Sequence, residues 1–183
     1  MEAPSPKRKT AKGATALVII VAMCGLSVPC VGVLSAIAIP AFIGYLQRAK
    51  TAEASANLRS LFSAADAYYR DEHWGGDGAA ATACAVGGGR TTNVPGPGKT
   101  LLGPLGEPFD ALGFSIADPV YYQYEVVGVG GCDHRPGEPL YSFRAYGDLD
   151  GDGATSLFEI SGWVGPDGNL ERSAGIYREN ENE

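Results

Sequence analysis

The chain has 183 residues, of which 45% are hydrophobic, a size and composition that suit one globular domain. Its formal net charge is −7, yet four basic residues, Lys7, Arg8, Lys9 and Lys12, precede residue 13 and face a single acidic residue there, Glu2. The rest of the chain therefore carries a charge of about −10. Such an acidic part is a poor candidate for binding nucleic acid, so no nucleic-acid partner is predicted for it.

A long uncharged segment follows the basic residues. No side chain from Gly13 to Gln47 is charged, and residues 14–39 are nearly all Ala, Val, Ile, Leu, Met, Cys or Gly. Because about 20 such residues form a helix long enough to cross a bilayer, residues 14–46 are predicted to form a single transmembrane helix. A cleaved secretory signal is the alternative, but its apolar region is typically only about 7–15 residues long.

The basic residues set the expected orientation of this helix. Positive flanks of a membrane helix stay on the cytoplasmic side. Residues 1–13 are therefore predicted to be a cytoplasmic tail, and residues 47–183 an exported head.

The helix is predicted to continue beyond the membrane to about residue 73. The first strong breaker after Pro40 is the pair Gly75 and Gly76, and the Ala-rich composition favours helix throughout. Bends are expected near Pro29 and Pro40, because proline lacks the N–H that a helix interior uses. Apolar residues at three- and four-residue intervals should form one buried stripe: Leu58, Leu61, Phe62, Ala65 and Tyr69.

The rest of the head divides into an irregular part and a strand-rich part. Residues 74–118 are rich in Gly, Pro and Ala and predict a long loop, which a compact domain tolerates only if something holds it in place. Residues 119–179 predict antiparallel strands from their aromatic and β-branched content. The segments are 120–129, 139–149, 155–164 and 169–179. The predicted fold class is α+β, with the long helix packed on a small antiparallel sheet.

Two of the four cysteines can hold the loop. Cys84 lies in the Gly-rich region and Cys132 between two predicted strands, both on the exported side, where disulfides persist. A bridge between them would close a loop of about fifty residues and is expected to stabilise the head by about 4 kcal/mol. Cys24 and Cys30 lie within the apolar helix and are interpreted as small packing residues.

The stretch GDLDGDGATSLFEI has the spacing of a calcium-binding loop, D-x-[DN]-x-[DN]-G-x5-E. Carboxylates on alternate residues of a tight loop converge on one point, and a carbonyl and a bidentate glutamate would complete the ligand set. The candidate ligands are Asp148, Asp150, Asp152, Ala154 through its carbonyl, and Glu159.

The flanking segments read as strands, so an EF-hand fold is rejected and only the loop is retained as a calcium hypothesis. A solvated Asp/Gly hairpin turn is the alternative, because Asp and Gly dominate turns for conformational reasons alone.

The segment VLSAIAIPAFIGYLQRAKTAEASANLRSLFSAADAYY resembles the N-terminal helix of type IV pilins and pseudopilins. In that family an apolar helix containing AAIAIP passes into an amphipathic, Ala-rich half, and a variable loop and an antiparallel sheet follow. The resemblance covers residues 33–70. It implies a bacterial inner-membrane protein with one membrane pass and a periplasmic head. It also implies lateral assembly with identical or other pilin-like subunits and with a pilus or secretion assembly platform.

The family's leader junction has a partial counterpart. Gly13 followed by Ala14 resembles the site at which prepilin peptidase cleaves and the new N-terminus is methylated, but the fifth residue after Gly13 is Val18 where the family has a glutamate. This departure favours a minor, tip or unprocessed subunit over a principal one.

Two functions follow from these observations. The first is a structural subunit of a type IV pilus or a secretion pseudopilus, with adhesion, motility or protein secretion as the family's roles. The alternative is a monomeric, membrane-anchored module that binds calcium or another ligand through its exported head. No acid–base or nucleophile constellation is evident, so an enzyme is not predicted.

Overall fold

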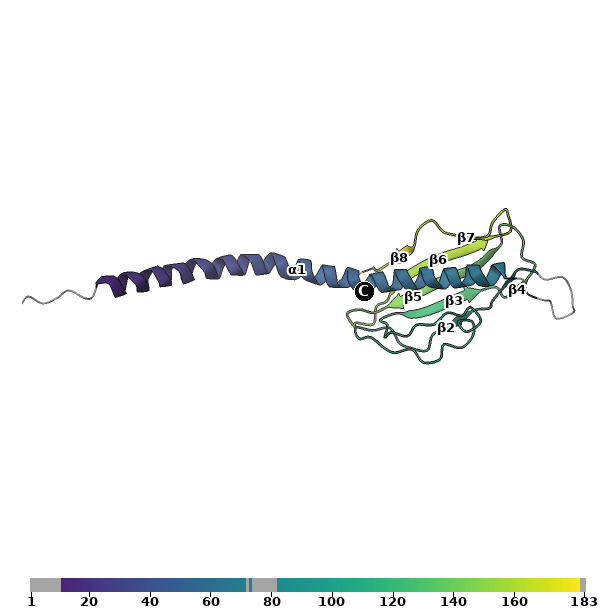
Figure 1. Cartoon of the computed structure of the whole chain (residues 1–183), viewed down its shortest axis with the longest axis horizontal. Helices are drawn as coiled ribbons and strands as arrows, with labels where there is room; N and C mark the ends of the chain where they lie inside the picture. The colour runs from purple at the N-terminus through teal and green to yellow at the C-terminus, as the bar shows by residue number, and fades with distance from the viewer. Residues whose placement is uncertain (1–10, 72, 74–81, 182–183) are drawn as a thin grey trace, which may run out of the picture. The chain divides into compact units, whose positions relative to one another are not determined.

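The structure, a computed structural model, describes residues 11–71, 73 and 82–181, with the side chains of the helix described from Val31 onward. The chain divides into two compact units, Met1–Leu46 and Gln47–Glu183. The helix α1 extends over Ala11–Arg70 and thus belongs to both units (Figure 1). Helical structure continues through Pro29 and Pro40, and a bend at either proline stays a prediction.

The helix ends slightly before the predicted residue 73. His73 instead forms an isolated antiparallel bridge with Thr82, in which the backbone N–H of each residue donates to the carbonyl of the other at 3.1 Å. These bonds use the backbone groups of His73 that a further helical turn would need.

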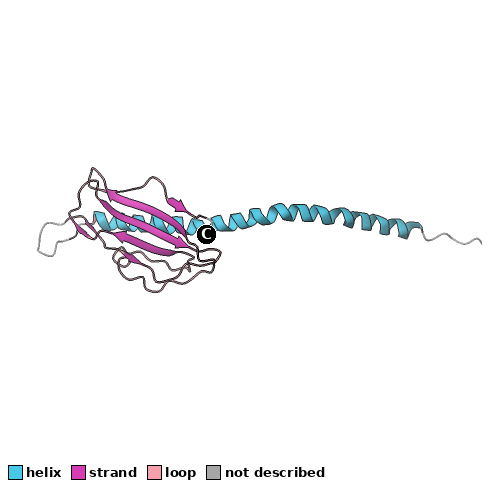
Figure 2. Cartoon of the chain, turned by 180° about the vertical axis from the view of Figure 1, so that it is seen from behind, coloured by secondary structure: helices cyan, strands magenta, loops and turns pink. Residues whose placement is uncertain are grey.

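The head is an antiparallel sheet with a helix on one face. The six-stranded sheet has the order β2-β3-β5-β6-β7, with β8 also pairing β6, and β1 and β4 form a separate two-stranded sheet. The head part of α1 lies in front of the sheet in Figure 1 and behind it in Figure 2. The strands are β1 (Cys84–Ala85), β2 (Gly89–Arg90), β3 (Gln123–Gly128), β4 (Gly131–Cys132), β5 (Pro139–Gly147), β6 (Ser156–Val164), β7 (Leu170–Arg172) and β8 (Tyr177–Glu179).

The core lies between this helix and the sheet. In the helix the predicted stripe is confirmed: four of its members are buried and Phe62 packs partly buried against them. The long strands β5 and β6 alternate buried and partly exposed residues, as expected for a sheet with one covered face. The inward residues include Phe143, Phe158 and Ile160, all fully buried.

The region 74–118 is not wholly irregular, which corrects the sequence prediction. Its described part contributes β1 and β2, because Gly89 and Arg90 pair with Val126 and Glu125 at the edge of the main sheet. It also contributes five residues to the hydrophobic core: Ala85, Val86, Phe109, Leu112 and Phe114. Apolar side chains spaced among glycines and prolines carry no helix or strand period, so the pattern alone could not reveal that they are buried.

The last predicted strand, residues 169–179, is also divided. It forms β7 and β8, both paired with β6, with Ser173–Ile176 between them. Ser173 still donates its N–H to Ser161 of β6, at 2.9 Å, so the chain leaves the edge only over Ala174 to Ile176.

Candidate functional site

The aspartate loop joins β5 to β6. Carboxylate oxygens of Asp148, Asp150 and Asp152 all lie within 4.8 Å of one another. Asp148 is half-buried, and the other two are exposed. Two oxygens bound to one calcium ion at 2.3–2.6 Å can be at most about 5 Å apart, so the three aspartates fit a single ion.

The hydrogen bonds of this loop also fit a plain turn. Asp148 accepts the N–H groups of Gly151 at 2.7 Å and Gly153 at 3.3 Å. Asp152 accepts the N–H of Ala154 at 2.7 Å, and Asp150 accepts that of Asp152 at 3.2 Å. Asp side chains favour such bonds to the following backbone without any ion. The geometry is thus compatible with both interpretations of the loop.

Glu159, the predicted fifth ligand, does not join the aspartates. It lies on the outer face of β6, where the Nε of Arg144 donates to its carboxylate at 2.9 Å. Ser161 donates a further hydrogen bond to it at 3.3 Å. The strand β6 begins at Ser156, so Glu159 is already the fourth residue of a sheet strand and not part of the loop. The structure therefore supports three carboxylate ligands and not four.

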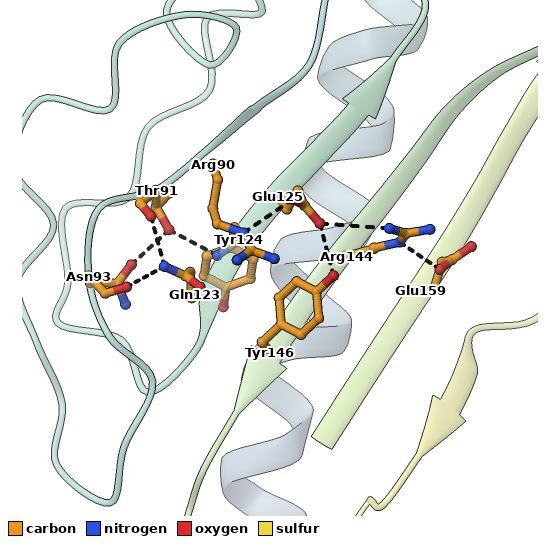
Figure 3. Close-up of polar contacts among 9 residues, drawn as sticks. All are labelled: Arg90, Thr91, Asn93, Gln123, Tyr124, Glu125, Arg144, Tyr146 and Glu159. Carbon is orange, nitrogen blue, oxygen red and sulfur yellow. Dashed lines mark hydrogen bonds and ion pairs between the residues drawn. The ribbon is translucent and has the colours of Figure 1, made fainter. Parts of the chain in front are cut away.

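Glu159 belongs instead to a row of alternating charges across the outer face of the sheet (Figure 3). The row follows the register of the strands, because each residue is the direct cross-strand partner of the next. Arg90 bonds Glu125 at 3.2 Å, Arg144 lies 3.8 Å from the other oxygen of Glu125, and Arg144 bonds Glu159. We call Arg90, Glu125, Arg144 and Glu159 the charge row.

A tyrosine completes the charge row. The hydroxyl of Tyr146 donates to Glu125 at 2.9 Å, and the guanidinium of Arg90 lies 4.6 Å from the centre of the Tyr146 ring (Figure 3). Partial burial by itself would raise the pKa of Glu159, but neighbouring serine hydroxyls and the Arg144 guanidinium outweigh it and hold the pKa below its ordinary value. The row is internally neutralised, so it stabilises the sheet and offers no free charge for a ligand.

Sequence reasoning missed the charge row. The signal was present as charged residues at outward positions of three predicted strands. Only the strand register places Glu125, Arg144 and Glu159 side by side, and register cannot be read from one sequence.

A second polar group, also missed, holds the loop region against β3. Thr91 and Asn93 are buried, and the hydroxyl of Thr91 donates to Asn93 at 2.7 Å and accepts the N–H of Tyr124 at 2.9 Å (Figure 3). The amide of Gln123 donates to the backbone carbonyls of Thr91 at 3.0 Å and Asn93 at 2.6 Å. The amide of Asn93 in turn donates to the carbonyl of Tyr122 at 3.0 Å. These bonds pair the buried polar groups of an otherwise irregular segment.

The disulfide supplies the other attachment. Cys84 and Cys132 are bonded, and they are direct partners in the β1–β4 pair. Close by, the N–H of Val86 donates to the hydroxyl of Tyr141 at 2.8 Å, and burial raises the pKa of Tyr141 to about 12. The loop region is thus fixed both by a covalent bond and by buried polar contacts.

The apolar part of α1 is uncovered in its own unit. By length and composition, the described part of the chain contains one helix able to cross a membrane or to act as a signal sequence. Nine large apolar side chains there are 44–69% exposed: Val31, Val33, Leu34, Ile37, Ile39, Phe42, Ile43, Tyr45 and Leu46. They point in all directions around the helix, since their spacing follows no single face.

Gly13, Ala14 and Pro29 lie in the part of α1 whose side chains are outside the described residues, and Pro40 is exposed on the helix.

Comparison with known proteins adds no assignment. No family model, curated protein or solved structure matches this chain.

Proposed function

We propose that this protein is a pilin-like structural subunit, held in the bacterial inner membrane before assembly and packed through its apolar helix into a type IV pilus or secretion pseudopilus. The observation that carries the proposal is the exposed apolar helix, taken with its length. Residues 14–46 are 33 in number. At about 1.5 Å per residue they span about 50 Å, whereas the hydrocarbon core of a bilayer is about 30 Å thick.

Lipid alone therefore leaves about 20 Å of apolar helix uncovered. Exposed apolar side chains of this number need a protein partner, and identical helices packed side by side would cover all of them. A proline is tolerated in such a helix because neighbouring helices surround the weakened turn. In this arrangement the acidic α+β head is displayed on the outside.

Filament membership tests the proposal. Sheared surface filaments and membranes are analysed by mass spectrometry for this chain and its N-terminal peptide. Recovery in filaments is expected, and Ala14 as the first residue, with or without methylation, would identify prepilin peptidase as the processing enzyme. Recovery in membranes alone, with the basic tail intact, overturns the filament and favours the anchored module.

A pair of variants isolates the role of the helix. Phe42→Lys places a charge on the exposed apolar helix, where Phe42 is 61% exposed. We expect this variant to be lost from filaments and retained in membranes. A lysine near the end of the apolar segment 14–46 can extend its ammonium group to the membrane–water interface. Val94→Lys makes a comparable change at an 80% exposed residue of the head and should leave assembly intact. Equal loss of both variants would show that apolar helix packing is not the determinant.

The aspartate loop favours the second candidate, a membrane-anchored module whose head binds calcium. Three convergent carboxylates are its support. In a filament the same ion would stiffen the exposed head, so calcium binding is compatible with both candidates and filament membership alone separates them.

A further inference from the structure

An open groove runs along the head part of α1, beside the C-terminal segment. Its volume is about 460 Å³, within the range of small binding sites. Its floor is made of small residues, Ala52, Ser55 and Ala56, which keep the helix backbone accessible. Arg48 and Arg59 stand at its two ends, eleven residues and thus about 16 Å apart along the helix.

The groove is basic although the head as a whole is acidic. Arg178 on its far wall is already paired with Glu181 at 2.9 Å. Within the described residues, neither Arg48 nor Arg59 forms an ion pair or a side-chain hydrogen bond. Arginine stays charged at any physiological pH, so two guanidinium groups without an acidic partner among residues 31–71, 73 and 82–181 flank the groove.

The complementary charge on this chain is the aspartate loop. Asp148, Asp150 and Asp152 are within 4.8 Å of one another and accept only backbone N–H groups. No cationic side chain of the described residues pairs with any of them. Three like charges at this distance repel one another, so an opposite charge brought to the loop is favourable.

The loop and the groove lie at the same end of the sheet. Thr155, which follows the loop, accepts a hydrogen bond from the side chain of Asn180 at 3.5 Å, and Asn180 precedes Glu181 of the groove. The loop nevertheless does not reach the arginines of its own chain. Adjacent patches of opposite sign are self-complementary between copies, because the loop of one copy can meet the groove of another.

We propose that the groove between Arg48 and Arg59 receives the Asp148–Asp152 loop of a second copy of this chain. This contact rests on the proposed self-association and names the head surfaces that make it. The small residues of the floor admit the backbone of the exposed loop, and the guanidinium forks of the two arginines bind its carboxylates. A divalent cation held by the aspartates competes with the contact, because both use the same oxygens.

Photo-crosslinking of the full chain in detergent micelles tests the contact. Ser60, exposed and next to Arg59, is replaced by benzoylphenylalanine in a chain of natural isotope content. This chain is mixed with an unmodified ¹⁵N-labelled chain in the presence of a chelator. We expect crosslinks from position 60 to the peptide that contains Asp148–Asp152 of the heavy copy. Crosslinks only to the same light chain, or only to other segments, overturn the proposal.

Charge reversal makes the test specific. Arg59→Glu in the light chain, or Asp152→Lys in the heavy chain, should each lower the yield of this crosslink by roughly tenfold. Mixing the two variants restores an opposite pair and should restore most of the yield, which also shows that both variants fold. Asp152 is chosen because Asp148, with two backbone bonds, shapes the loop. Failure of the mixture to recover overturns the contact.

The control is benzoylphenylalanine at Ala67, an exposed residue of the same helix outside the groove, which should give no crosslink to the loop. Equal crosslinking from both positions would indicate micelle crowding and overturn the assignment. The result is separable from the proposed function. Assembly into filaments without the heavy-chain crosslink refutes this contact alone, whereas the crosslink in a chain that never enters filaments supports the contact and refutes the filament.

Discussion

Removal of the Cys84–Cys132 disulfide should destabilise the head strongly. The two cysteines are 48 residues apart in sequence. In the chain-entropy model, releasing a loop of this length restores to the unfolded chain freedom equivalent to about 4 kcal/mol. That loss is a large part of the 5–15 kcal/mol by which folded domains are typically stable. The change is Cys84→Ala together with Cys132→Ala.

Urea unfolding of the full chain in detergent, followed by near-ultraviolet circular dichroism, measures the effect. With a slope of about 2 kcal/mol per M of urea, the midpoint should fall by roughly 2 M. The control is Cys24→Ala with Cys30→Ala, the same pair of substitutions in the other unit, which should leave the midpoint of head unfolding in place. A loss below about 1 kcal/mol for the Cys84 and Cys132 variant would refute the reasoning. It would mean that the unfolded chain stays restricted in this region even without the bridge.

Three further predictions concern the loop, the core and the charge row. Millimolar calcium should raise the melting temperature of the head by a few degrees. At a calcium concentration ten times the dissociation constant, binding adds about 1.4 kcal/mol to the free energy of unfolding. Asp148→Ala with Asp150→Ala should abolish the rise and Asp167→Ala should not, while an absent rise in the unmodified chain would favour the plain turn. Leu61→Ala, at a fully buried position, should lower the free energy of unfolding by about 2–5 kcal/mol. Leu101→Ala, at a residue that is 67% exposed, should lower it by less than about 0.5 kcal/mol. Similar losses in both variants would contradict the assigned core. Because the pKa of Glu159 is lowered in the folded head from its ordinary 4.5, the unfolded chain binds protons first on acidification. The stability that Glu159 contributes should therefore be constant from neutral pH to about 5 and decrease once the pH falls below the ordinary pKa. A pH series of thermal melts measures this, and a rise in stability on acidification would contradict the predicted direction.

The amino-acid sequence alone was enough to predict the elements that depend on local pattern. The apolar segment follows from its uninterrupted composition. The buried stripe through Leu58 and Leu61 and the strands β5 and β6 follow from periodicity, which side-chain geometry imposes on helices and strands. The disulfide followed from a different constraint, since Cys84 lies in an irregular region that needs fixing and Cys132 was the other cysteine outside the apolar helix. The aspartate spacing also predicted that three carboxylates would converge, because a tight loop brings alternate residues to one point.

Tertiary structure alone decided which residues of distant segments meet. Glu159 completes a ligand motif in sequence, yet strand register places it opposite Arg144 and thus in the charge row. Thr91 and Asn93 carry no pattern at all, but the fold buries them where β3 offers matching backbone groups. Local sequence restricts backbone conformation within a few residues, whereas these pairings arise when β3, β5 and β6 align and the helix covers their common face. The register that results is a property of the whole packed head and of no single segment.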